Sequence, residues 1–311
     1  MKEKALLFGK FKTLVGVLTE PDLSADGDLP AVILSNAGLI HRIGPNRIYV
    51  KLARHLAARG YRVLRFDLSG IGDSLPRPDH LPAEQFTVDD VVQAMDHLSE
   101  SGSRSFVLMG HCAGAYHSFR TAAQDPRVAG VVMMNPDGGE AEWIEYDRKR
   151  KLARYYENYY GKKTLFDPQR WKRFFSGQIH YRNVLQTFFR NVIMNRVSGL
   201  LFKLKQRFSP RQSAPQDGKL FSIEAILTRL LELDVPTLLV LSANATSLER
   251  IQTGMGKTLK RLQAAQKLNL VVIPDADHIF SPLSSQADLL QQITRWLDNR
   301  FESKTAARKG V

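Results

Sequence analysis

Cys112 is the only cysteine of the chain, and it stands at the centre of the sequence Gly-His-Cys-Ala-Gly over residues 110–114. An apolar run, residues 105–109, precedes this pentapeptide, and a helix-like segment, residues 113–124, follows it. Glycines on both flanks allow a strand to turn sharply into a helix, which holds the central side chain clear of the sheet. The spacing therefore predicts a nucleophile elbow with a thiol as the nucleophile. A small buried cysteine at a strand end is the structural alternative.

A thiol becomes a nucleophile when a neighbouring base takes its proton. The candidate base is His278, which follows the last expected strand, residues 268–273, and precedes the closing helix, residues 286–301. This position places it on the same side of a parallel sheet as Cys112. His111 is a weaker candidate, because neighbours on an elbow diverge, and we expect it to line the cleft or pack beneath it.

Acyl chemistry also needs two N–H donors near the developing negative charge. One should be the main-chain amide of Ala113, which opens the helix after the nucleophile. The other should come from the loop after the strand at residues 31–35, where the amides of Ala37, Gly38 and Leu39 are the candidates. Asn36 and His41, in the same loop, are expected to line the cleft. An ordinary tight turn would show the same residues.

Short β-rich runs alternate with helical patterns along the chain, which predicts an α/β fold with a mostly parallel central sheet and helices on both faces. Residues 5–10 and 14–19 are typical of an opening hairpin. The remaining expected strands are residues 31–35, 61–66, 105–109, 128–134, 237–241 and 268–273, and the helices include 47–59, 88–99, 113–124 and 286–301.

The 311 residues suffice for a large core, and the single cysteine excludes an internal disulfide and a cysteine-based metal cluster. A reducing cytoplasm fits this cysteine usage. The first eight residues are typical of a strand and not of a signal peptide, and no apolar run approaches the roughly 18 residues of a membrane span. We expect no metal and no cofactor, and a cytoplasmic location with peripheral membrane contact as an option.

The net charge of +13 is concentrated in one stretch. Residues 148–211 hold 17 lysines and arginines against Glu157 and Asp167, and they are rich in aromatic residues. This change in composition predicts an inserted helical cap over residues 140–232, an α/β core formed by residues 1–139 and 233–303, and a disordered tail, residues 304–311.

The charge of the expected cap favours an anionic partner, such as an acidic acyl carrier protein, a coenzyme A thioester or an anionic membrane surface. A solvated helical surface whose aromatic residues pack on the core is the alternative. Nucleic acid is disfavoured, because no nucleic-acid-binding motif accompanies the charge.

Four segments together resemble an α/β-hydrolase of the serine aminopeptidase-like group, which includes bacterial hydrolases of exosortase and exopolysaccharide loci. They are residues 36–47, residues 64–74, the elbow, and Asp277-His278 with Phe280. The resemblance implies the α/β-hydrolase fold over most of residues 5–137 and 235–300. Asp67 and Asp73 lie in the turn after a strand, and we expect them to fix that loop. Dienelactone hydrolases and polyhydroxyalkanoate synthases of this superfamily also carry cysteine at the elbow.

The sequence departs from this superfamily at the acid that usually orients the histidine. That acid normally follows the strand before the last, but here residues 242–246 contain no carboxylate. Asp137, after the strand at residues 128–134, could take the role, as in some haloalkane dehalogenases. Asn244 could act as a neutral partner, because a thiolate–imidazolium pair depends less on an acid than a serine–histidine pair does. A degenerate site without turnover is the third interpretation.

The sequence thus favours a hydrolase of the esterase or thioesterase type, in which Cys112 and His278 act through an acyl-thioester intermediate. An acyltransferase that passes the acyl group from a thioester to an alcohol or amine is the first alternative. A non-catalytic scaffold that binds a membrane or a carrier protein is the second, because fold alone does not determine function.

Overall fold

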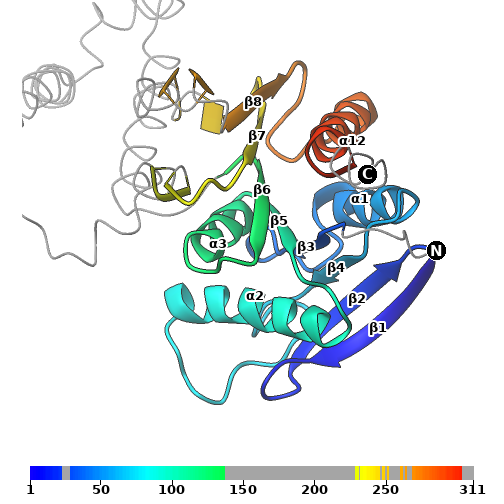
Figure 1. Cartoon of the computed structure of the whole chain (residues 1–311), viewed down its shortest axis with the longest axis vertical. Helices are drawn as coiled ribbons and strands as arrows, with labels where there is room; N and C mark the ends of the chain where they lie inside the picture. The colour runs from blue at the N-terminus through cyan, green and yellow to red at the C-terminus, as the bar shows by residue number, and fades with distance from the viewer. Residues whose placement is uncertain are drawn as a thin grey trace, which may run out of the picture. The chain divides into compact units, whose positions relative to one another are not determined.

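The computed structural model describes residues 1–22, 29–136, 228–248 apart from 231 and 246, 251, 260–264 apart from 262, and 268–302. Within these residues, eight strands form one sheet in the order β1-β2-β4-β3-β5-β6-β7-β8 (Figure 1). The strands are β1 (Lys2–Phe8), β2 (Leu14–Glu20), β3 (Ala31–Ser35), β4 (Val63–Phe66), β5 (Phe106–His111), β6 (Val128–Met134), β7 (Thr237–Ser242) and β8 (Leu268–Ile273).

The sheet is antiparallel only at its first edge. β1 and β2 form a hairpin, and β2 pairs antiparallel with β4, whereas all pairs from β4 through β3, β5, β6 and β7 to β8 are parallel. Every residue of β3, β4, β5 and β7 is buried. Continuous apolar strands of this kind need cover on both faces, which is the reason the central sheet is parallel and flanked by helices.

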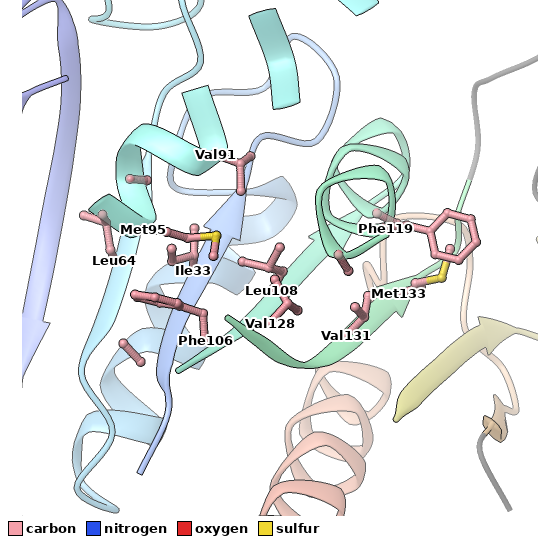
Figure 2. Close-up of a cluster of buried hydrophobic side chains, with 14 of the residues drawn as sticks. Ile33, Leu64, Val91, Met95, Phe106, Leu108, Phe119, Val128, Val131 and Met133 are labelled. Carbon is pink, nitrogen blue, oxygen red and sulfur yellow. The ribbon is translucent and has the colours of Figure 1, made fainter. Parts of the chain in front are cut away.

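Two pairs of helices supply that cover. α2 (Ala83–Glu100) and α3 (Ala113–Ala122) pack on one face, and α1 (Ile48–Ala57) and α12 (Leu283–Leu297) pack on the other (Figure 1). Figure 2 shows part of the α2/α3 core, in which α2 and α3 contribute Val91, Met95 and Phe119 and the strands contribute Ile33, Phe106, Leu108, Val131 and Met133.

The predicted alternation of strands and helices is confirmed, with shifts at the ends of elements. α2 begins five residues before the predicted residue 88, because Pro82 stands at its N-cap with an extended backbone and the chain turns helical directly after it. α12 occupies residues 283–297, and a short π-helical segment, Asp298–Glu302, completes the predicted closing helix.

The predicted cap, residues 140–232, lies outside the described residues except for its last few positions, and so does the predicted tail, residues 304–311. Of those last positions, Leu230 is buried in the α2/α3 core. In the part of the chain that the structure describes, no helix combines the length and the apolar character needed to span a membrane.

Candidate active site

Cys112 occupies the turn between β5 and α3, with φ 55° and ψ −121°. This backbone conformation is costly for a residue with a side chain, and it persists because neighbouring bonds hold it. The N–H of Cys112 donates to the carbonyl of Met134 on β6 at 3.0 Å, and its own carbonyl accepts the N–H of Ala115 at 3.2 Å. The side chain is partly exposed. The turn therefore presents a thiol at the N-terminus of a helix, a place where main-chain N–H groups can stabilise an anion.

The glycines of the elbow are required by close packing. A Cβ atom at Gly110 would stand 2.1 Å from the carbonyl carbon of Gly114, and one at Gly114 would stand 2.3 Å from the carbonyl oxygen of Asn36. The second contact also shows that the loop after β3 runs directly against the elbow. Both oxyanion-hole segments predicted from the sequence thus meet at the carboxyl edge of the sheet.

The loop after β3 makes a tight turn in which the N–H of Ile40 donates to the carbonyl of Ala37 at 3.1 Å. Gly38 has φ +61°, and no atom lies within 4 Å of the position that a Cβ would take. Ala37 is buried, whereas Leu39 is 90% exposed, and His41 is also exposed. The turn therefore leaves its central residues open at the edge where the elbow lies.

Asn36 and Asp67 hold this loop in place. Asn36 is fully buried, its Nδ2 donates to the carbonyl of Ile40 at 2.9 Å and to Asp67 at 3.2 Å, and its Oδ1 accepts the N–H of Leu68 at 2.6 Å. Asp67 also accepts the main-chain N–H and the guanidinium of Arg42. Asn36 thus supports the loop from inside. The prediction that Asp67 fixes the strand-end turn is confirmed.

His278 lies in the loop after β8, at the same edge of the sheet, and is partly exposed. His111, the residue before Cys112, contacts His278 twice. The Nε2 of His111 is 2.6 Å from the carbonyl oxygen of His278, and the two imidazole rings are 4.9 Å apart between centroids, at 59°. His111 is buried, so it packs beneath the edge of the sheet, which is one of the two places that the sequence predicts for it.

The loop that carries His278 is hydrogen-bonded at successive carbonyls. Asn46 Nδ2 donates to the carbonyl of Ile279 at 3.0 Å, and Gln286 Nε2 donates to that of Phe280 at 2.8 Å. The ring of Phe280 is fully buried in the α1/α12 core. The loop is therefore anchored by Asn46, by α12 and by the α1/α12 core, as a general base in a fixed position would require.

Comparison with known proteins identifies the family. A model described as the alpha/beta hydrolase family matches residues 38–292, which is most of the chain. The chain belongs to the alpha/beta hydrolase family. The predicted α/β-hydrolase fold is thereby confirmed, while the narrower resemblance to the serine aminopeptidase-like group stays a prediction.

Among curated proteins, this alpha/beta hydrolase is similar to Esterase EstD of Thermotoga maritima, with 30% identity over 145 residues. The match covers 45% of this chain and 34% of EstD, so the chain spans about a third of the length of that relative.

Solved structures share the fold at low identity. The structure of DcsB in complex with its substrate analogue has a TM-score of 0.55 at 16% identity and covers 96% of this chain and 100% of its own. The malate-bound thermophilic esterase of Thermogutta terrifontis has a TM-score of 0.53 at 18% identity and covers 97% and 100%.

Two residues of this alpha/beta hydrolase that sequence reasoning missed connect the parts of the site. Tyr49 of α1 is fully buried, and its hydroxyl donates to the carbonyl of Ser35 and accepts the N–H of His111, both at 2.8 Å. Burial raises the pKa of Tyr49, the hydrogen bond from His111 opposes that rise, and negative charge on Cys112 adds to it. A tyrosine on the apolar face of a helix looks like ordinary core, so the sequence carried no signal of this bridge.

Asn135 is the second such residue. It follows β6 with φ 41°, and it is fully buried. Its Nδ2 donates to Ser242 Oγ at 2.6 Å and to the carbonyl of His278 at 2.8 Å, while its Oδ1 accepts the N–H of Ser242 at 2.7 Å. The sequence Asn-Pro-Asp-Gly-Gly predicts only a turn here.

The structure leaves the orienting acid of the alpha/beta hydrolase site open. Asp137 lies outside the described residues. Asn244 is exposed, and its main-chain N–H donates to the carbonyl of Ala276 at 3.2 Å, in the loop that carries His278. Among the described residues, no group of three or more His, Cys, Asp or Glu side chains could hold a metal ion.

Proposed function

We propose that this alpha/beta hydrolase cleaves an ester or thioester bond, with Cys112 as the nucleophile and His278 as the general base. The observation that carries the proposal is the strained turn at Cys112, which presents a thiol to the N-terminus of α3 while the adjacent residue holds the loop of His278. A costly backbone conformation at a reactive side chain supports a functional role, because such strain clusters at active sites.

In the proposed reaction, His278 takes the thiol proton and the sulfur of Cys112 adds to the substrate carbonyl. The oxyanion is stabilised by the N–H of Ala113 and by N–H groups of residues 37–39. His278 then donates the proton to the leaving alkoxide or thiolate, which leaves an acyl-thioester on Cys112. Water attacks this thioester, His278 accepts the proton of the water and returns it to the departing sulfur, and the free acid is released.

Two relatives support an ester as the substrate class, because EstD and the Thermogutta protein are both named esterases. If an alcohol or amine reaches the acyl-thioester before water does, the same steps produce acyl transfer. We further propose a cytoplasmic protein whose basic stretch, residues 148–211, docks an acidic acyl carrier protein, a coenzyme A thioester or an anionic membrane surface.

Intact-mass analysis tests the proposal directly. The protein is incubated with activated esters and with acyl thioesters, and the wild type should gain one acyl group that maps to Cys112. Cys112→Ala should gain none, and His278→Ala should acylate at least tenfold more slowly, since general-base catalysis supplies about 10²–10⁴ in rate. Acylation at another residue, or an equal rate in His278→Ala, would show that the Cys112–His278 pair is wrong.

A further inference from the structure

One main-chain oxygen, the carbonyl of His278, accepts hydrogen bonds from two buried side chains. His111 reaches it from the end of β5 at 2.6 Å, and Asn135 reaches it from the end of β6 at 2.8 Å. A carbonyl oxygen has two lone pairs, so these two donors can saturate it. The oxygen belongs to the proposed base itself and not to a neighbour in the loop.

Both donors are themselves fixed by other bonds. The N–H of His111 donates to the buried hydroxyl of Tyr49, and the amide of Asn135 is held by the N–H and Oγ of Ser242. Asn135 also has a left-handed backbone, a conformation that asparagine tolerates better than most residues. The two donors therefore have defined positions independent of His278, which a fortuitous surface contact would lack.

The contact includes the ring of the base. The imidazoles of His111 and His278 lie 4.9 Å apart, so the His111 ring limits where the His278 ring can turn. To donate to a carbonyl, His111 must carry a proton on Nε2. His111 is also directly bonded in sequence to Cys112, so a single dipeptide carries the nucleophile and holds the base.

We propose that His111 and Asn135 are positioning residues that clamp the carbonyl of His278 and thereby place its imidazole against Cys112. The inference rests on the proposed Cys112–His278 function and deepens it. Neither residue contacts the substrate in this proposal, and both act only through His278.

The test measures the pH profile of Cys112 alkylation by iodoacetamide. His111→Phe keeps a ring in the same place but removes the hydrogen-bond donor, whereas His111→Gln keeps an N–H donor. Asn135→Gly removes the other donor, and glycine tolerates the left-handed backbone at this position. Ser242→Ala is the matched control, because it removes a buried bond to Asn135 and leaves both donors on His278. Thermal unfolding confirms that each variant is folded.

With the clamp weakened, the imidazolium of His278 no longer stabilises the thiolate, so the apparent pKa of Cys112 should move towards that of an ordinary thiol. His111→Phe and Asn135→Gly should each react on the order of tenfold more slowly than the wild type near pH 6, a loss equivalent to one pKa unit. They should match it near pH 10, where the thiol is ionised in every variant. His111→Gln should recover most of the loss, and Ser242→Ala should follow the wild type.

The outcomes separate the two proposals. If the wild type and His278→Ala share one alkylation profile, there is no catalytic pair, and both the function and the clamp are wrong. If His278→Ala changes the profile but His111→Phe and Asn135→Gly do not, the pair stands and the clamp is overturned. If His111→Phe fails to fold, Asn135→Gly decides the question against Ser242→Ala. If both donor variants fail to fold, His111→Gln and His111→Ala are compared instead. A wild-type profile in His111→Gln together with slow alkylation in His111→Ala supports the clamp. Loss of fold in His111→Ala as well overturns the clamp as a catalytic device.

Discussion

At the scale of single residues, a thiol at the elbow changes what its partners must supply. A serine hydroxyl must lose its proton during attack, whereas a cysteine can exist as a thiolate beside an imidazolium before substrate arrives. The acid that orients the histidine is then less necessary, and a neutral residue can take its role. Around His278 two described side chains, those of His111 and Asn135, donate hydrogen bonds to its carbonyl oxygen.

The choice between the two predicted orienting residues can be tested by turnover. If Asp137 orients His278, Asp137→Asn should lower kcat steeply and Asn244→Ala should change it little, and the pattern should reverse if Asn244 has the role. Loss of the acid in a serine triad costs about 10⁴ in kcat, and we expect a smaller loss with cysteine. Steady-state kinetics on the ester found by mass analysis measure this. A normal kcat in both variants would leave a Cys112–His278 dyad.

At the scale of elements, the site depends on two loops at the carboxyl edge of the sheet that touch without any side chain between them. β3 and β5 are neighbours in register, with Ser35 opposite Gly110, so the loop after β3 must pass the start of α3. Gly114 is the residue that makes room for it, because its missing Cβ would overlap the carbonyl oxygens of Asn36 and Ser35.

Gly114→Ala should therefore destabilise the fold and disturb the site at once. The overlap with backbone atoms cannot be relieved by a side-chain rotation, so we expect a loss of more than about 2 kcal/mol in the free energy of unfolding. Gly102→Ala is the control, because Gly102 has φ +97° but nothing within 4 Å of its Cβ position, and its strain should cost about 1 kcal/mol. Urea unfolding measures both. Equal losses would mean that the loop can move away from the elbow.

At the scale of the whole molecule, a partly buried histidine links stability to pH. Burial lowers the pKa of His117 on α3 to about 4, and the positive charge of Arg120 adds to the effect. The folded state therefore binds fewer protons than the unfolded state between about pH 6.5 and pH 4. Stability is fully present above this window and falls as the pH drops through it.

His117→Gln should reduce this acid sensitivity. Between pH 6.5 and pH 4 the free energy of unfolding of the variant should fall less than that of the wild type, by on the order of 2–3 kcal/mol. Urea unfolding at a series of pH values measures the slopes. His80→Gln, which replaces an exposed histidine, is the control variant. Identical slopes for the wild type and His117→Gln would show that His117 is not the linked group.

The uneven charge of the chain predicts a salt-dependent partner. Because exposed charges are screened beyond roughly 8 Å at physiological salt, binding to anionic vesicles or to an acidic carrier protein should weaken as salt rises. Changing Lys149, Arg150, Lys151 and Arg154 to Glu should abolish binding and leave cleavage of a small neutral ester intact. Sedimentation with vesicles measures this. Binding that ignores salt, or no binding at low salt, would identify residues 148–211 as an ordinary solvated surface.

The sequence by itself determined the fold class and indicated two candidate catalytic residues. Apolar strands alternating with amphipathic helices specify a covered parallel sheet, because burial follows a local period that can be read from residue types. The glycines around Cys112 specify a sharp turn, because residues without a side chain allow a strand to turn directly into a helix. Because parallel strands end at one edge of the sheet, a residue that follows the last strand, such as His278, lies at the same edge as Cys112.

Only the tertiary structure decided which side chains join these parts. His111 meets His278 across 167 positions of sequence, and Asn135 meets it across 143. Hydrogen bonds of this range have no period and no spacing, since they depend on which strands the sheet places side by side. Tyr49 looks like core and Asn135 looks like a turn until the strands are assembled. The candidate residues could therefore be read from the sequence, whereas the hydrogen bonds that connect them arise from the packing of distant segments.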